Sequence, residues 1–123
     1  MVSSFSELQL VTRKWRQHNF PNQTAEDQFY GMVEEIGEIA HAALKQRQGI
    51  RGDENHGLNE MDAIGDLVIY LCGYCDARNL SLFQCINLAW SEVSERDWIA
   101  YPGTGRPPEA DSHTTDKLYG GTD

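Results

Sequence analysis

Apolar residues recur at helical spacing in four segments of this 123-residue chain, and this periodicity restricts its fold more than any other feature. The first segment begins with Ser4 and Glu7, a capping-box pair, and the second begins with Thr24 and Asp27. No segment alternates apolar and polar residues strictly enough to predict a strand. The pattern therefore predicts an all-α fold.

Glycine and proline residues mark the ends of the predicted helices. Gly49 is expected to end the second helix and Pro102 the fourth, and Trp90 lies in the apolar stripe of the fourth helix and is assigned to the core. Residues 103–123 have little apolar content and many Gly, Pro, Ser and Thr residues. We therefore expect one helical domain over residues 1–102, followed by an extended or disordered tail over 103–123. The predicted helices, in chain order, cover residues 4–19, 24–48, 59–78 and 81–101, with a loop over 46–58.

The charge and composition of the chain disfavour several classes of protein. Ten basic and 19 acidic residues give a formal net charge of −9. Such a chain repels a phosphate backbone, so we expect no nucleic-acid partner. No apolar run approaches the roughly 20 residues that a membrane span needs, and the N-terminus lacks the basic and then apolar segments of a signal peptide. We therefore expect a cytoplasmic protein without a membrane partner.

Cys72 and Cys75 form a CxxC on an apolar stripe without a second ligand pair, which favours core cysteines over a zinc or redox site.

The second predicted helix carries three glutamates, Glu34, Glu35 and Glu38, on the side opposite its apolar residues. The simplest interpretation is an amphipathic helix whose acids face solvent. A bound cation is the alternative, because no basic residue stands on that side before Lys45 to relieve the repulsion between like charges. Gly31 on the same side also costs about 1 kcal/mol in a helix relative to alanine, which suggests that another group approaches closely. The residues expected to face the core are Phe29, Val33, Ile36, Ala40 and Ala43.

The third predicted helix adds two aspartates, Asp62 and Asp66. Asp66 precedes nine uncharged residues, LVIYLCGYC, so most sides of this helix are expected to be buried. A carboxylate among aliphatic neighbours must be paired, protonated or bound to metal, because desolvating an unpaired ion is costly. Two such helices side by side would gather the acids of both, and all-oxygen ligation favours Mg²⁺ or Mn²⁺ over zinc. The predicted metal ligands are Glu34, Glu35, Glu38, Asp62 and Asp66.

These two acid motifs together resemble a known family. The sequence EEIGE at residues 34–38, followed by a loop and DAIGD at residues 62–66, is similar to the MazG-like nucleoside triphosphate pyrophosphohydrolases, whose signature is EExxE and then ExxD on the next helix. The likeness covers residues 20–102 and implies a four-helix MazG-like bundle. The chain departs from the family at Ala63, where a glutamate is expected, and Asp62 is the nearest acid, offset by about 40° on the same face.

The resemblance implies hydrolysis of a nucleoside triphosphate to the monophosphate and pyrophosphate, as in nucleotide-pool housecleaning. Mg²⁺, or Mn²⁺, held by the five acids would bridge this acidic protein to the triphosphate. Glu34 and Glu35 are the expected catalytic residues, with Glu34 suited to a second ion or to orienting the attacking water. Because family members assemble as dimers or tetramers, a homodimer or homotetramer with its site near a subunit interface is also expected.

Five further residues are candidates for contact with the substrate. Lys45 could reach a phosphate oxygen, although a solvated lysine at the end of a helix explains it as well. Three aromatic residues could stack on the base, although core or interface positions would explain them too. Asp97 stands where the last helix of the family often has an asparagine before a Tyr-Pro pair. The candidates are Trp15, Lys45, Asp97, Trp98 and Tyr101.

Two other functions stay open. A MazG-like bundle could bind Mg²⁺ and nucleotide without turnover, because Asp62 and Ala63 depart from the ExxD pattern. A regulatory or structural oligomer, whose acids repel nucleic acid or pair with a basic partner, is the other alternative. A rise in melting temperature with Mg²⁺ that depends on Asp66 would argue against this second alternative.

Overall fold

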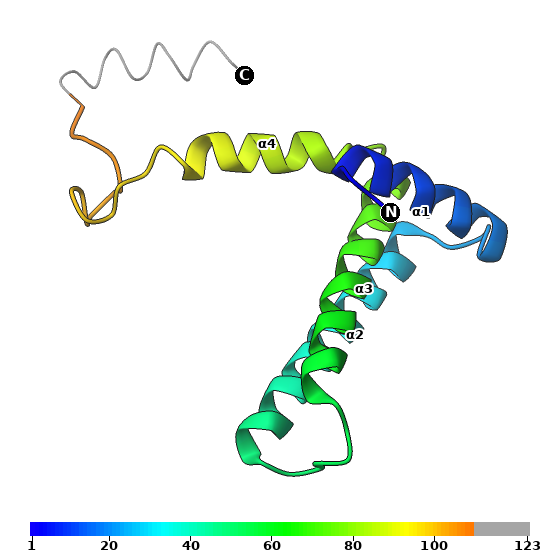
Figure 1. Ribbon diagram of the computed structural model, residues 1–123. Coiled ribbons are helices and arrows are strands. Elements are labelled where there is room, and N and C mark those ends of the chain that lie inside the picture. Colours follow the sequence, from blue (N-terminus) through cyan, green and yellow to red (C-terminus); the bar gives the residue numbers. More distant parts are fainter. Residues whose placement is uncertain (110–123) are drawn as a thin grey trace. The chain divides into compact units, whose positions relative to one another are not determined.

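The computed structural model describes residues 1–109, and over this range the chain is all-α, without strands (Figure 1). The predicted class is therefore confirmed. No helix in the described range is long and apolar enough to cross a membrane. The four helices are α1 (Phe5–Asn19), α2 (Ala25–Gln48), α3 (His56–Ala77) and α4 (Leu82–Val93).

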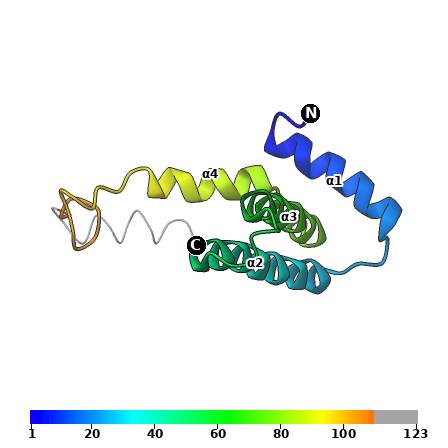
Figure 2. The same ribbon diagram turned by 60° about the horizontal axis from the view of Figure 1, so that its bottom comes forward.

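The chain divides into two compact units, the first covering Met1–Asn87 and the second starting at Leu88. In the first unit, α2 and α3 lie side by side as an antiparallel hairpin, and α1 packs against α3 (Figure 1, Figure 2). The prediction of one domain ending at Pro102 stays a prediction. The predicted tail falls mostly on residues 110–123, which lie outside the described part of the chain.

The first two helices begin where their capping residues predict. Ser4 accepts a hydrogen bond from the backbone N–H of Glu7 at 3.1 Å. At the start of α2 the capping box is complete, because the Thr24 hydroxyl accepts from the backbone N–H of Asp27 at 3.2 Å and the Asp27 carboxylate accepts from the Thr24 N–H at 2.9 Å. Gly49 ends α2 with φ of 69°, the left-handed conformation that glycine adopts without strain.

Helix α3 begins three residues earlier than predicted, at His56 and not at Asn59. The side chain of Asn55 caps it by accepting a hydrogen bond from the backbone N–H of Leu58 at 3.0 Å. The glycine-rich sequence suggested a longer loop, but one asparagine cap is enough to start the helix within it.

Helix α4 ends at Val93, so the predicted extension to about residue 101 is wrong. Asp97 caps a separate turn, in which its Oδ1 accepts from the backbone N–H groups of Ile99 at 3.0 Å and Ala100 at 2.9 Å. This local side-chain bonding competes with helix formation. Trp90 is 62% exposed, so its assignment to the core is wrong for the single chain.

The core of the first unit lies where α1, α3 and the first turn of α4 meet. Cys72 is fully buried, Cys75 is 3% exposed, and both are free thiols, as predicted. Burial raises the pKa of the Cys72 thiol, so the group stays neutral as a small apolar side chain. The buried residues Cys72, Cys75 and Leu82 pack with Leu8, Leu71 and Ile86.

The packed side of α2 is the opposite of the predicted one. Gly31 is buried because the ring of Tyr70 from α3 lies against the α2 backbone, where a Cβ on residue 31 would collide with it. Close approach along small residues therefore decides which side of α2 packs, and the apolar stripe is left at the surface. The prediction that the apolar stripe forms the core is wrong within the single chain. All five residues of that stripe are exposed: Phe29, Val33, Ile36, Ala40 and Ala43.

Candidate carboxylate site

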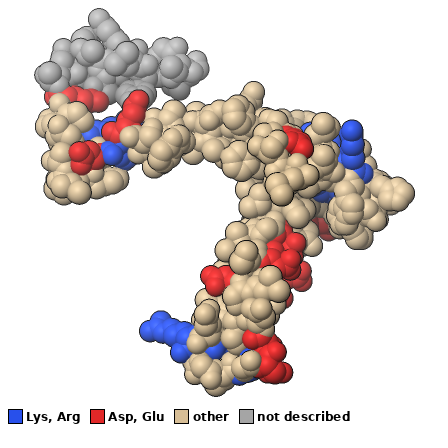
Figure 3. Space-filling view, viewed as in Figure 1, with Lys and Arg blue, Asp and Glu red and all other residues tan. Residues whose placement is uncertain are grey.

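The five predicted metal-binding acids lie on the hairpin formed by α2 and α3. Glu35 and Asp66 are half-buried, and both line one pocket of about 550 Å³. Acidic side chains gather along this hairpin in the surface view (Figure 3). The other three acids, Glu34, Glu38 and Asp62, are exposed.

Burial and like charge act together on these acids. Burial raises the pKa of Glu35, and the negative charges of Asp66, Glu34, Glu38 and Asp62 raise it further. Burial also raises the pKa of Asp66, with an added contribution from the charge and hydrogen bond of Asp62. Within residues 1–109 no ion pair neutralises any of the five. The cluster is therefore short of positive charge and would be relieved by a cation or a proton.

Tyr70 closes one side of the site. Its ring lies over Gly31 and lines the pocket that Glu35 and Asp66 share. Burial raises the pKa of Tyr70, and the charges of Glu34, Glu35 and Asp66 add to this effect. The hydroxyl therefore stays protonated at neutral pH and can act as a hydrogen-bond donor. The sequence signal for this contact is Gly31, whose small size predicted a close neighbour without identifying it.

The donors of this cluster suit a hard cation, because all are carboxylate oxygens. In the part of the chain that the structure describes, however, no three His, Cys, Asp or Glu side chains are placed so that they could hold a metal ion together. Glu34, Glu38 and Asp62 are exposed, so their side chains can change rotamer at little cost. A metal site here therefore requires the exposed acids to turn toward Glu35 and Asp66.

Two of the predicted substrate-binding residues belong to the first unit. Trp15 lines the pocket that Glu35 and Asp66 share and is 54% exposed, so part of the residue remains accessible. Lys45 does not line that pocket, and its Nζ donates a hydrogen bond to the Gln48 side chain at 3.1 Å. The structure thus brings Trp15, but not Lys45, to the half-buried acids.

The remaining predicted substrate-binding residues, Asp97, Trp98 and Tyr101, belong to the second unit, where each makes local contacts. Besides capping its turn, Asp97 accepts a hydrogen bond through its backbone carbonyl from the N–H of Tyr101 at 2.9 Å. The Arg96 guanidinium lies 5.5 Å from the centre of the Trp98 ring. These contacts order the segment after α4, and a role in substrate binding stays a prediction.

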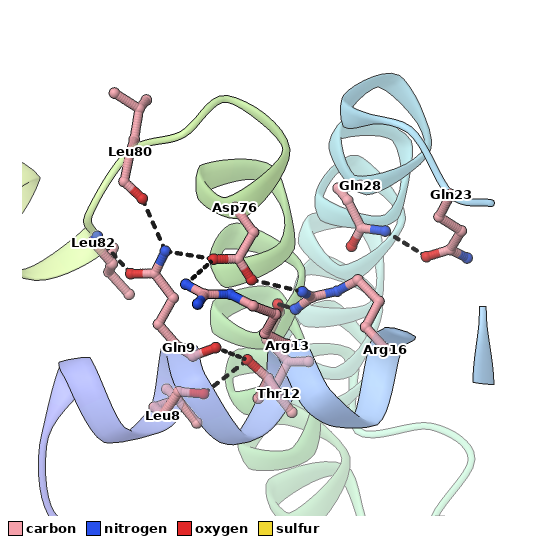
Figure 4. Close-up of polar contacts among 11 residues, drawn as sticks. Leu8, Gln9, Thr12, Arg13, Arg16, Gln23, Gln28, Asp76, Leu80 and Leu82 are labelled. Atoms are coloured by element: carbon pink, nitrogen blue, oxygen red, sulfur yellow. Dashed lines mark hydrogen bonds and ion pairs between the residues drawn. The ribbon is translucent and has the colours of Figure 1, made fainter. Parts of the chain in front are cut away.

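Sequence reasoning missed a polar network around Asp76, shown in Figure 4. Its carboxylate accepts hydrogen bonds from Gln9 Nε2 at 2.7 Å, Arg13 Nη2 at 2.8 Å and Arg16 Nη1 at 2.9 Å. Burial alone would raise the pKa of Asp76, but the hydrogen bonds from Arg13, Gln9 and Arg16 outweigh burial and lower it. The available signal was the polar set Gln9, Arg13 and Arg16, spaced four and three residues apart on one face of α1.

Two glutamines near the start of α2 were also missed. Gln28 is 3% exposed, and its Nε2 donates a hydrogen bond to Gln23 Oε1 (Figure 4). Both line the pocket of Glu35 and Asp66, and both also line a second pocket of about 800 Å³ beside α1. No sequence signal separates them from ordinary surface glutamines, because the burial of Gln28 depends on the contact between helices and Gln23 itself is exposed. Comparison of the chain with protein-family models, with curated proteins and with solved structures finds no match, so the resemblance to the MazG-like hydrolases rests on the two acid motifs alone.

Proposed function

We propose that this chain is a metal-dependent nucleoside triphosphate pyrophosphohydrolase of the MazG-like type, with a role in nucleotide-pool housecleaning. One observation carries the proposal: Glu35 and Asp66, one from each acid motif, line a single pocket from adjacent helices, and Trp15 lines the same pocket. Carboxylates suit the cation that accompanies a triphosphate, and an exposed indole suits a base. The pocket therefore combines groups for both ends of a nucleotide.

The acid cluster would hold Mg²⁺ or Mn²⁺, with Glu35 and Asp66 as its fixed donors and the exposed acids as its adaptable ones. Bound metal would offset the negative charge of the triphosphate and lower the pKa of the attacking water. Glu34 is exposed next to Glu35 and is suited to orient that water or to hold a second ion. Tyr70 would restrict the access of bulk water from its side and offer a hydrogen-bond donor.

We also propose that the protein forms a homodimer or homotetramer, and that the four-helix MazG-like bundle is completed by a second copy. The support is the exposed apolar stripe of α2, where Phe29, Val33 and Ile36 are 49%, 52% and 54% exposed. Exposed apolar area of this extent commonly marks an interface between proteins. Replacing Ile36 with lysine should give a monomer in sedimentation at micromolar concentration. A wild-type monomer with full hydrolytic activity would contradict the oligomer.

The test of the activity is release of pyrophosphate from a panel of ribo- and deoxynucleoside triphosphates, with Mg²⁺, with Mn²⁺ and with chelator. We expect metal-dependent release that Asp66→Asn and Glu35→Gln reduce by at least about 100-fold, as for loss of groups that bind the catalytic metal. Glu60→Gln is the matched control, because Glu60 lies on α3 but does not contribute to the raised pKa of Glu35 or Asp66. Absence of release from every nucleotide would contradict the proposal.

Nucleotide binding without turnover is the second candidate, and two observations favour it. No three described acids are in place to hold a metal, and Ala63, at the position of the family glutamate, is 3% exposed between the helices. Ala63→Glu would therefore bury a charge and destabilise the fold, which makes it a poor test of lost activity. Asp62→Glu instead lengthens an exposed side chain. Metal-dependent nucleotide binding by the wild type, with turnover only in the Asp62→Glu variant, would support this candidate.

A further inference from the structure

The pocket that holds Glu35 and Asp66 extends along α2 to Gln28, which lies seven residues before Glu35. At a rise of 1.5 Å per residue, Gln28 and Glu35 are about 10 Å apart along the helix axis. Trp15 and Gln23 line the same pocket near the Gln28 end. A ligand whose charged end lies at the acids would therefore place its other end beside the two glutamines.

Packing fixes the buried side chain of Gln28, and the exposed side chain of Gln23 is bonded to it. Gln28 is 3% exposed, so its amide cannot turn without disturbing the packing between helices. Its carboxamide lies directly over Gly73 of α3, and a Cβ on residue 73 would collide with the Gln28 Oε1. Its Nε2 is engaged by Gln23 Oε1 (Figure 4). Polar groups fixed in this way can discriminate between ligands, because they cannot adapt to the wrong one.

One carbonyl oxygen of the pair accepts a hydrogen bond within the pair, and the other lies against the backbone of α3, which leaves the donors for a ligand. Gln23 Oε1 accepts from Gln28, and Gln28 Oε1 is turned onto the α3 backbone at Gly73. A carboxamide has one carbonyl acceptor and two N–H donors, so the N–H groups of Gln23 and the second N–H of Gln28 are what the pair can offer. A ring that presents a carbonyl oxygen would satisfy these donors, whereas a ring with an amino group at the same edge would oppose donor to donor.

The walls of this end of the pocket are aromatic. The rings of Trp15 and Phe20 meet edge to face, with centroids 5.7 Å apart, and both line the pocket. We infer that the Gln23–Gln28 pair reads the base of the nucleotide stacked against Trp15, and selects bases with a keto oxygen at the recognised edge (uracil, thymine and guanine) over cytosine and adenine. This inference rests on the proposed function for the class of ligand, and it adds the specificity that the acid cluster alone does not supply.

The experiment compares kcat/KM for dUTP, dTTP and dGTP with that for dCTP and dATP, and measures binding of the corresponding monophosphates by calorimetry. The variant Gln23→Glu replaces the donating amide with an acceptor of the same shape and keeps an oxygen for Gln28. We expect the wild type to favour keto bases and Gln23→Glu to lower that preference by roughly 10-fold, less than at a fully buried hydrogen-bonding site because Gln23 is exposed. Gln17→Glu is the matched control, because Gln17 lines only the larger pocket.

The outcomes separate this inference from the proposed function. If no triphosphate is hydrolysed but the monophosphates bind with a keto preference that Gln23→Glu removes, the proposed function fails and the inference stands. If hydrolysis occurs without base preference, or with a preference for cytosine and adenine, the inference is overturned. It is also overturned if Gln23→Glu changes selectivity no more than Gln17→Glu does. Gln23→Ala, which removes the donors without adding charge, replaces Gln23→Glu should that variant not fold.

Discussion

Two aspartates of α3, ten residues apart, have opposite surroundings. Asp76 accepts hydrogen bonds from Arg13, Arg16 and Gln9, and its pKa is lowered. Asp66 lies beside Asp62, and its pKa is raised by burial and by that neighbour. The same residue type on the same helix is therefore neutralised within the chain near the C-terminal end of α3 and left uncompensated in its middle.

The difference separates structure from function. The Asp76 network is complete within the described chain, because both oxygens of the Asp76 carboxylate accept hydrogen bonds and its charge is paired, and it joins α1 to α3. The acid cluster around Asp66 stores repulsion that folding does not relieve, and such uncompensated charge in a pocket is typical of sites that bind a ligand. The comparison predicts that changes near Asp76 reduce stability, while changes near Asp66 alter binding and leave stability unchanged or improved.

The largest effect is expected from Asp76→Asn. The substitution removes the charge that pairs with Arg13 and Arg16 and turns one acceptor into a donor. We expect a loss of about 2–3 kcal/mol in the free energy of unfolding, below the roughly 3–5 kcal/mol of a fully buried pair because Arg13 is exposed. Urea unfolding at pH 7 measures it, with Asp53→Asn in the exposed loop as control. Equal stability of the two variants would contradict the structural role that the comparison assigns to Asp76.

The packing of the acid-bearing hairpin is tested by two glycine substitutions of opposite expected sign. In Gly31→Ala the new methyl group collides with the Tyr70 ring, and overpacking of this kind costs about 1–3 kcal/mol. Gly37 lies on the same helix with no atom within 4 Å of a Cβ built there, so Gly37→Ala should stabilise by up to about 1 kcal/mol. Thermal unfolding of both variants measures the difference. Stabilisation by both would contradict the contact between Gly31 and Tyr70.

A smaller and opposite effect is expected from Asp66→Asn in the absence of metal. Removing one like charge relieves the repulsion with Asp62 and Glu35, so the metal-free protein should gain stability, by less than about 1 kcal/mol because water screens the cluster. Melting temperatures with chelator measure this gain, and melting with Mg²⁺ shows whether the stabilisation by metal is lost with Asp66. A clear loss of stability in chelator would show that Asp66 is structural, like Asp76.

Local signals made the helices predictable. Thr24 with Asp27 and the glycine at residue 49 fix both ends of α2 within a few residues of chain, so no distant contact was needed. Helical spacing also puts Glu35 and Asp66 on definite sides of their helices, but their meeting in one pocket depends on how α2 packs on α3. The sequence therefore indicated which acids each helix carries.

Contacts between distant segments were not predictable. Helical periodicity assigned Val33 and the other apolar residues of α2 to the core. In the structure, the close contact between Gly31 and Tyr70 buries the other side of the helix. The Asp76 network joins residues 60 or more positions apart, and nothing near Asp76 in the sequence identifies Arg13 as its partner. Helix α4 stops short because Asp97 bonds to its own turn, a local signal that the apolar pattern obscured.

The pH dependence of stability should distinguish the Asp76 network from the acid cluster around Asp66. This effect is expected to be the smallest of those predicted, but also the most specific. The pKa of Asp76 is lowered on folding, so its stabilisation is present above the ordinary carboxyl value of 3.8 and is lost as pH falls through the folded pKa. The pKa of Glu35 is raised on folding, so its ionised form destabilises the metal-free protein at neutral pH. That cost disappears as pH falls through the raised pKa toward the ordinary value of 4.5. In chelator, the stability difference between wild type and Glu35→Gln should therefore shrink on mild acidification from neutral pH, while the difference between wild type and Asp76→Asn should shrink only below about pH 4.

Urea unfolding at half-unit steps of pH measures both differences. Curves for the wild type and both variants that stay parallel from pH 7 to pH 3 would show that neither carboxylate changes its proton affinity on folding, and the contrast between the Asp76 network and the acid cluster would then have no electrostatic basis.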